Sequence, residues 1–188
     1  DEPITSTGAN VFMVIGARNN GKSYRILWRA LEDYLKTGHT TAWARRWEID
    51  FVKLNTDFLF NSHIKNGMLT KLNEKYGTDW EDICYWCKAW YLCKYDEKGK
   101  RVKDRRPFMY AFSLNTVEHG KSGWNDPNCL RLVLEEFMPT SSQGELSNEW
   151  TQWQTLMSTV KRKPKSIKDM EIWFLGNTLT LHSTYLQN

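Results

Sequence analysis

The sequence predicts an α/β domain in which helices flank a largely parallel central sheet, with an inserted β-hairpin. Short apolar runs alternate along the chain with stretches of helical periodicity, the pattern of strand–helix–strand units. One aromatic-rich stretch surrounds a polar turn containing glycine, as in a hairpin. The 188 residues, of which 40% are hydrophobic, are enough for one domain with a sizeable core. We therefore expect a single domain over residues 1–188.

The first part of the chain predicts a strand, a helix and a second strand. Val11–Ile15 is a short apolar run that ends at Gly16, which suits a buried strand. Lys22–Lys36 carries apolar residues at helical spacing, and Gly38 is a helix stop. Thr40–Arg46 is rich in β-branched and aromatic residues, which favours a strand.

The middle of the chain predicts helices followed by the hairpin. Asp50–Tyr76 is expected to be helical in two pieces, broken around Asn66-Gly67. Ile83–Tyr95 is expected to form the first hairpin strand, in which alternate residues share a face. A turn over Asp96–Lys100 would lead into a return strand that reaches about Leu114.

The last part predicts two more strands with a helix between them. Cys129–Leu134 is an apolar run interrupted only by one arginine. Ser142–Glu145 has the form of a capping box, so a helix with one aromatic and apolar face should run from there to Val160. Glu171–Leu175 is the final hydrophobic strand, stopped by Gly176-Asn177.

The segment between the first strand and the first helix reads G-x-x-x-x-G-K-S. Its two glycines permit backbone angles that turn N–H groups toward phosphate oxygens. A lysine in this pattern meets the β- and γ-phosphates, the serine hydroxyl ligates Mg²⁺, and the helix N-terminus attracts the anion. A glycine-rich turn without a ligand is the alternative. The predicted nucleotide-binding residues are Gly16, Ala17, Arg18, Asn19, Asn20, Gly21, Lys22, Ser23 and Tyr24, with Ser23 also a metal ligand.

Two adjacent carboxylates follow the Cys129–Leu134 strand. Because ligands of open α/β sheets bind at the carboxyl ends of the strands, Glu135 and Glu136 are expected beside the phosphates. By position, Glu135 would act on the water shell of the metal, and Glu136 would polarise the attacking water. The alternative is an exposed acidic turn.

Two further polar residues are candidates for catalysis. Arg162 lies between the tryptophan-rich helix and the last strand, where its guanidinium could reach the nucleotide of a neighbouring subunit as an arginine finger. A solvated or DNA-facing loop is the alternative for Arg162. Asn177 could sense the γ-phosphate or position water, and its alternative is a simple turn residue.

Basic charge is concentrated in two short segments of a chain whose formal net charge is +4. Lys94–Arg106 holds seven basic and three acidic residues, and Lys161–Lys168 holds five basic residues and no acid. Such segments can contact phosphates without reading sequence, although either could be a solvated loop. The candidate DNA contacts are Lys100, Arg101, Lys103, Lys161, Lys163 and Lys165.

Other classes of protein receive less support. Cys84, Cys87 and Cys93 are close in sequence but lack the spaced partner of a four-ligand zinc site, so reduced strand cysteines are favoured over a metal site. The scattered histidines give no local support for a nucleophile–histidine site. No apolar run approaches the ~20 residues of a membrane span, so a membrane partner is not expected.

Five motifs in order resemble the DNA-packaging motor ATPases of small tailed phages with protein-primed linear genomes. They read V-I-G-A-R-N-N-G-K-S-Y from Val14, A-R-R-W from Ala44, L-V-L-E-E-F from Leu132, L-M-S-T-V-K-R from Leu156 and F-L-G-N-T from Phe174. The resemblance implies the N-terminal ATPase domain of that family, with the additional-strand, catalytic-glutamate P-loop NTPase fold. On this resemblance, we expect the 188 residues not to include the C-terminal nuclease-like domain of the family.

The resemblance also implies an activity and partners. The expected cofactors are ATP and Mg²⁺, and the expected assembly is a homo-oligomeric ring, a pentamer in the family, around double-stranded viral DNA. The ring would sit at the portal of an empty capsid in the host-cell cytoplasm, with a structural packaging RNA as a further candidate partner. Glu136 would be the catalytic glutamate and Arg162 the finger that acts in trans. Glu135 replaces the aspartate usual in the family, so its contact with the metal is open.

Two rival functions use the same loop. A small-molecule kinase would add an acceptor pocket and lid arginines, and a nucleic-acid-binding module would hold the nucleotide only as a switch. The Glu135-Glu136 pair at the strand end favours hydrolysis over phosphate transfer to an acceptor.

Overall fold

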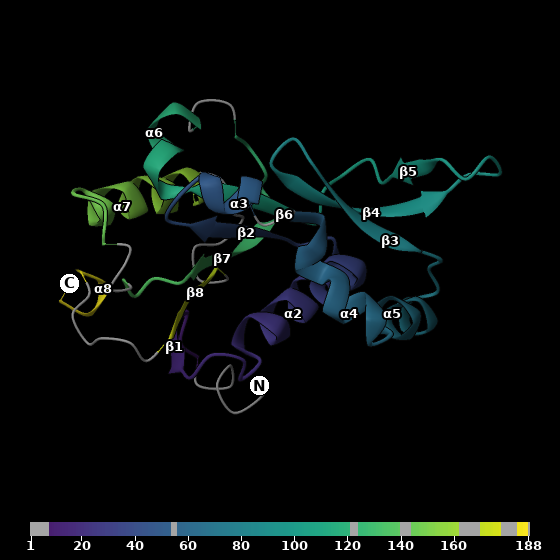
Figure 1. Cartoon of the computed structure of the whole chain (residues 1–188), viewed down its shortest axis with the longest axis horizontal. Helices are drawn as coiled ribbons and strands as arrows, with labels where there is room; N and C mark the ends of the chain where they lie inside the picture. The colour runs from purple at the N-terminus through teal and green to yellow at the C-terminus, as the bar shows by residue number, and fades with distance from the viewer. Residues whose placement is uncertain are drawn as a thin grey trace.

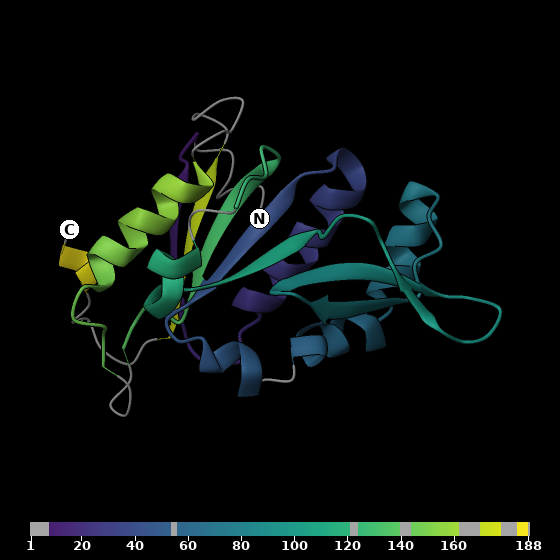
Figure 2. The same cartoon turned by 90° about the horizontal axis from the view of Figure 1, so that it is seen from above.

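A mixed β-sheet covered by helices on both faces forms the centre of the molecule (Figures 1 and 2). The computed structural model describes residues 8–53, 56–120, 124–139, 144–161, 170–177 and 184–187. Within these ranges the sheet has eight strands, five of them mutually parallel. The parallel strands lie in the order β1 (Val11–Gly16), β8 (Glu171–Asn177), β7 (Cys129–Glu135), β2 (Thr40–Arg45) and β6 (Met109–Ser113). The predicted α/β fold with a largely parallel sheet is confirmed.

The predicted hairpin is an antiparallel extension of the sheet that projects from the body of the molecule (Figure 1). It contains β3 (Asp82–Trp86), β4 (Ala89–Tyr95) and β5 (Arg101–Lys103). The prediction of one strand over Ile83–Tyr95 is wrong, because the chain reverses at Cys87 and Lys88, whose φ angles are 49° and 59°. Two positive φ angles make the two-residue turn typical of hairpins, formed here without glycine.

The hairpin correction changes two further expectations. Cys87 lies in the turn and is exposed, so it does not share a face with the buried Cys93. The predicted return strand to Leu114 is divided into β5 and β6, and β6 joins the parallel part of the sheet beside β2.

The helices of one face come from the first half of the chain. α2 (Lys22–Thr37) ends at Gly38, which adopts the left-handed conformation and donates its N–H to the Tyr34 carbonyl. The stretch predicted as two helical pieces contains more, and the expected break at Asn66-Gly67 separates the last two. These elements are α3 (Ile49–Lys53), η1 (Thr56–Phe60), α4 (Asn61–Lys65) and α5 (Met68–Tyr76).

The opposite face carries η2 (Leu114–Thr116), α6 (Val117–Gly120), α7 (Glu149–Val160) and α8 (Thr184–Gln187). The expected start of α7 at the capping box is wrong, because its first residue is Glu149. Ser142 and Gln143 of that motif lie outside the described residues. The Glu149 side chain instead accepts the N–H of Leu146 at 2.9 Å, a bond that stabilises the turn before the helix.

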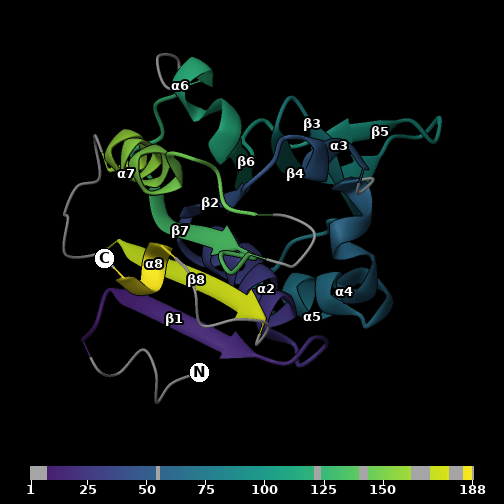
Figure 3. The ribbon, with the colours of Figure 1, turned by 60° about the vertical axis from the view of Figure 1, so that its left-hand side comes forward.

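The core has two layers because successive strand residues point to opposite faces of the sheet. On one face Trp43, Val133 and Trp173 pack with α2, and on the other Leu132, Phe174 and their neighbours pack with α7. Both faces are therefore buried, as parallel strands require. β1, β8 and β7 point the same way, so their carboxyl ends meet near the start of α2 (Figure 3). Among the described residues, none of the helices combines the length and apolar character that crossing a bilayer requires.

Candidate functional site

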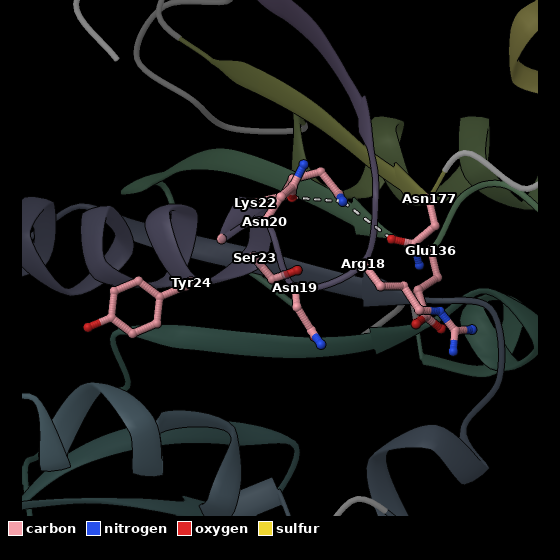
Figure 4. A pocket seen from close by; sticks show the side chains of 9 residues that line it. Arg18, Asn19, Asn20, Lys22, Ser23, Tyr24, Glu136 and Asn177 are labelled. Atoms are coloured by element: carbon pink, nitrogen blue, oxygen red, sulfur yellow. Dashed lines mark hydrogen bonds between the residues drawn. The ribbon is translucent and has the colours of Figure 1, made fainter.

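A cavity of about 590 Å³ lies where the carboxyl ends of β1, β7 and β8 meet the start of α2. Most of its lining comes from the β1–α2 loop and the first turn of α2, with one residue after β7 and one at the end of β8 (Figure 4). The lining residues are Arg18, Asn19, Asn20, Gly21, Lys22, Ser23, Tyr24, Glu136 and Asn177. The sequence analysis predicted each of these nine as a site residue.

The loop backbone bends sharply to open the cavity. Asn19 and Gly21 have φ angles of 60° and 82°, in the left-handed region that favours glycine. A Cβ added at Gly16 would lie 2.3 Å from the side-chain Nδ2 of Asn20, so that side chain would have to leave its present position. After these bends, the N-terminus of α2 faces the cavity, and its free N–H groups and dipole favour an anion there.

Lys22 is held at the centre of the loop by oxygen atoms. Its Nζ donates to the carbonyls of Gly16 and Ala17 at 2.9 and 2.8 Å and to Asn20 Oδ1 at 3.0 Å. A fourth acceptor, Asn177 Oδ1, lies 3.3 Å away. Because an ammonium has three hydrogens, these four acceptors share them. The loop therefore fixes one full positive charge at the anion-binding end of α2.

The residues of the cavity fit a hydrated Mg²⁺ ion bound with phosphates. Mg²⁺ keeps several waters and takes few protein ligands when phosphate oxygens complete its shell. Ser23 places its side chain in the cavity, and Glu136 is the carboxylate among the lining residues. Within the described ranges, no group of three or more histidine, cysteine or acidic side chains is placed to hold a metal ion by itself. Phosphate oxygens would therefore have to complete the shell of the ion.

Glu136 has an unusual backbone conformation for a residue that is not glycine. Its φ angle is 57°, in the left-handed region, which costs roughly 1 kcal/mol for an ordinary side chain. The residue is exposed, whereas its neighbour Glu135 is buried. Figure 4 places the side chains of Glu136, Arg18 and Asn177 at the same end of the cavity. The turn after β7 thus directs one of the two carboxylates into the cavity.

Glu135 is held by side chains of β2 and does not line the cavity. Its Oε2 accepts hydrogen bonds from Trp43 Nε1 at 3.1 Å and from Arg45 Nε at 2.8 Å, and the Arg45 NH2 group also pairs with it. Burial lowers the pKa of Arg45, but the Glu135 carboxylate raises it, and the net pKa lies above its ordinary value. Glu135, at the end of β7, is therefore anchored to the neighbouring strand β2 by Trp43 and Arg45.

Arg46 is a residue of the site that sequence reasoning missed. It forms a buried ion pair with Glu149, with Nε 2.6 Å from Oε2 and NH2 2.8 Å from Oε1. The same guanidinium donates to the carbonyls of Phe137 at 3.0 Å and Glu136 at 3.3 Å. Arg46 thus joins the end of β2 and the start of α7 to the turn that carries Glu136.

The predicted basic residues that the structure describes lie on two separate elements. Lys100 is exposed, Arg101 pairs with Asp82 at 2.6 Å, and Lys103 lies over the rings of Trp86 and Tyr91, all on the hairpin. Lys161 directly follows α7, an element separate from the hairpin. Arg162, Lys163 and Lys165 lie outside the described residues.

Comparison with solved structures finds close similarity of fold over nearly the whole chain. The N-terminal domain of the DNA packaging ATPase from bacteriophage phi29 superimposes with a TM-score of 0.72 and 20% sequence identity. The match covers 99% of this chain and 82% of that chain. The chain has the fold of a phage DNA-packaging ATPase domain. The phi-28 gp11 DNA packaging motor gives a TM-score of 0.68 with 23% identity, covering 93% of this chain and 48% of that one.

A phage terminase ATPase domain is similar in fold at a lower TM-score. The Thermus phage P74-26 large terminase ATPase domain gives a TM-score of 0.52 with 14% identity, covering 96% of this chain and 64% of that chain. The present chain spans about half the length of the phi-28 motor protein. No protein-family model matches the sequence, and comparison with curated proteins finds no match.

Proposed function

We propose that this chain is an ATP-hydrolysing motor domain that drives double-stranded viral DNA into a preformed capsid. The observation that carries the proposal is the convergence of Lys22, the start of α2 and the carboxylate of Glu136 on one cavity. The similarity of the fold to phage packaging-ATPase domains supports the same function.

The loop and Lys22 would bind the phosphates of ATP. The ammonium is held by four neutral oxygen acceptors, and phosphate oxygens that replace some of them would give it stronger, charge-assisted hydrogen bonds. Ser23 and the phosphates would hold Mg²⁺, and Glu135 would act on its water shell from the adjacent strand. When bound, the ion neutralises negative charge that develops on the transferring phosphoryl group.

Glu136 would act as the general base for hydrolysis. Its carboxylate takes a proton from the attacking water as the water oxygen bonds to the γ-phosphorus. The bond from that phosphorus to the β–γ bridging oxygen breaks, and ADP leaves with the electron pair. Asn177, next to Lys22, would orient the γ-phosphate or the water.

A neighbouring subunit would complete the site. Among the described residues, Arg18 is the one guanidinium that lines the cavity. An arginine finger supplied in trans typically accelerates phosphoryl transfer by about 10³- to 10⁵-fold. We assign this role to Arg162, so the working form would be a homo-oligomeric ring at the portal of a procapsid in the host-cell cytoplasm, with a packaging RNA as a candidate partner.

Two basic surfaces are candidates for contact with DNA phosphates. One is the hairpin with Lys100, Arg101 and Lys103, and the other is the segment with Lys161, Lys163 and Lys165. Phosphate contacts release counterions, so removing one of them should lower the salt dependence of DNA binding by about one unit of log–log slope. The assembled motor, with wild-type and charge-neutral variants of each surface, provides that measurement.

Steady-state ATP hydrolysis against protein concentration, with and without double-stranded DNA, tests the proposal. We expect the rate to rise faster than linearly, and Glu136→Gln and Arg162→Ala each to remove it. Mixing the two variants should restore activity, because some interfaces then combine an intact Glu136 with an intact Arg162. In the assay without DNA, Lys161→Ala is the matched control and should keep the wild-type rate per site.

Two results would contradict this account. Linear activity that is indifferent to Arg162→Ala would mean a self-contained site. ATP loss that depends on a small-molecule acceptor would instead identify the small-molecule kinase.

A further inference from the structure

The end of the cavity away from Glu136 is formed by an aromatic side chain. Tyr24 follows Ser23 in the first turn of α2 and lines the cavity. Figure 4 shows its ring pointing away from Asn177 and Glu136, which lie together on the other side. The cavity therefore has a carboxylate end and an aromatic end, with Lys22 between them.

One face of the Tyr24 ring is covered by a histidine from α4. The rings of Tyr24 and His63 are stacked, with centroids 3.9 Å apart and planes inclined by 7°. His63 is 1% exposed, and its Nε2 lies 2.8 Å from the backbone carbonyl of Tyr24. Since a carbonyl only accepts, Nε2 carries the hydrogen. Burial lowers the pKa of His63, which favours the neutral ring, so the stack adds no charge.

The hydroxyl of Tyr24 is also held. Asn66 Nδ2 donates to it at 3.3 Å. The Tyr24 ring is therefore held at two points, by His63 against one face and by Asn66 at the hydroxyl. The Trp28 ring lies one turn further along α2, with its centroid 6.4 Å from that of Tyr24 and its plane inclined by 40°. Tyr24 is half-buried, so the part of its ring that His63 and Trp28 leave open can meet a molecule in the cavity. A flat, neutral and fixed ring stacks a planar aromatic ligand with little loss of side-chain entropy.

The order of groups along the cavity matches the order of groups in a nucleotide. A phosphate chain anchored at Lys22, with its terminal phosphate toward Glu136 and Asn177, would place the base on the other side of the anchor. We propose that Tyr24, backed by His63, is the surface on which the nucleobase of the bound nucleotide stacks. This inference rests on the proposed function, because it requires a nucleoside triphosphate in the cavity.

Binding of two ligands that differ only in the nucleoside tests the proposal. ATP carries a base and ribose, and inorganic tripolyphosphate carries neither. The full chain is used with Glu136→Gln as the background, so that ATP is not consumed. We expect the background protein to bind ATP more tightly than tripolyphosphate. Adding Tyr24→Leu should weaken ATP binding by about 5- to 100-fold, the effect of removing one base–aromatic stack, and leave tripolyphosphate binding unchanged.

Two variants serve as controls. Tyr24→Phe keeps the ring and should retain ATP affinity. Trp86→Leu removes an exposed aromatic side chain of the hairpin, outside the cavity lining, and should change neither affinity. Equal losses for both ligands in Tyr24→Leu would mean that the residue only supports the loop, which overturns the proposal. Unchanged ATP affinity would overturn it as well.

Different binding results would contradict the stacking proposal and the proposed function. If the background protein binds both ligands with the same affinity, the base is not recognised and the stacking proposal fails while the phosphate site remains. If it binds neither ligand, both proposals fail.

Discussion

Lys22 Nζ lies 3.3 Å from Oδ1 of Asn177, a residue 155 positions further along the chain. The sheet creates this contact, because β8 lies between β1 and β7 and pairs Gly16 with Asn177 at the last position of the β1–β8 register. The anchoring lysine is thus held jointly by its own loop and by the end of the last strand. A ligand that moves Lys22 also changes its bond to Asn177.

Substitutions of Asn177 should separate the loss of a hydrogen bond from the addition of a charge. Asn177→Ala removes one shared bond to Lys22, worth about 0.5–1.5 kcal/mol, so ATP affinity should fall by no more than about 10-fold. Asn177→Asp places a carboxylate beside Lys22 that competes with phosphate, and the loss should be larger. Titration of both variants with ATP checks this order. Equal affinities in the two variants would mean that the side chain does not meet the phosphate end.

The local features of this site could be predicted from the sequence, and the long-range contacts could not. The loop, its glycines and the strand that ends at Glu135 are encoded within short windows, so periodicity and motif spacing found them. The partners of Arg45 and Arg46 lie 90 and 103 positions away, in neighbouring elements of the fold. Only the strand order reveals that Glu135 faces Arg45 while Glu136 faces the cavity.

The hairpin turn shows a second limit of sequence reasoning. Cys87 and Lys88 adopt positive φ angles without the Gly or Asn that usually marks such a turn. Alternating side chains continue through both strands, so the pattern alone predicted a single strand. The position of the turn is set by the pairing of Trp86 with Ala89 across the two strands. Such pairing belongs to the folded structure and cannot be read from the local sequence pattern.

The buried pair of Arg46 and Glu149 should be important for stability. Arg46→Met leaves the carboxylate of Glu149 buried without its charge partner, and Glu149→Leu does the same to the guanidinium. Each should lower the free energy of unfolding by about 3–5 kcal/mol. The double variant removes both charges and should lose much less than the sum of the two. Urea unfolding of the four proteins measures the coupling, and strictly additive losses would contradict a direct pair.

His63 should make the folded state sensitive to mild acid. Burial lowers its pKa below the ordinary 6.5, so below that pH the unfolded chain binds a proton that the folded chain excludes. The free energy of unfolding should therefore fall between about pH 7 and pH 5, by at most about 1.4 kcal/mol per pH unit. His63→Gln should flatten the profile in this window. A wild-type profile that stays level from pH 7 to pH 5 would contradict the buried neutral ring.

The two adjacent glutamates provide the most direct comparison of roles. Glu135 is buried against Arg45 and Trp43, and Glu136 lines the cavity from a left-handed turn. Glu135→Gln should lower the free energy of unfolding, because the half-buried Arg45 loses its charge partner. Glu136→Gln should leave that free energy unchanged. Urea unfolding of both variants tests whether Glu135, and not Glu136, also stabilises the fold through Arg45.

The rate of ATP hydrolysis by Glu136→Gln, measured beside its ATP affinity, tests the central claim most directly. The protein concentration should be one at which the wild type turns over. Removing a general base from a bound substrate should lower kcat by about 100-fold or more and leave ATP binding intact. Hydrolysis by Glu136→Gln at the wild-type rate would show that this cavity does not use Glu136 as its base, and the proposed mechanism would be wrong.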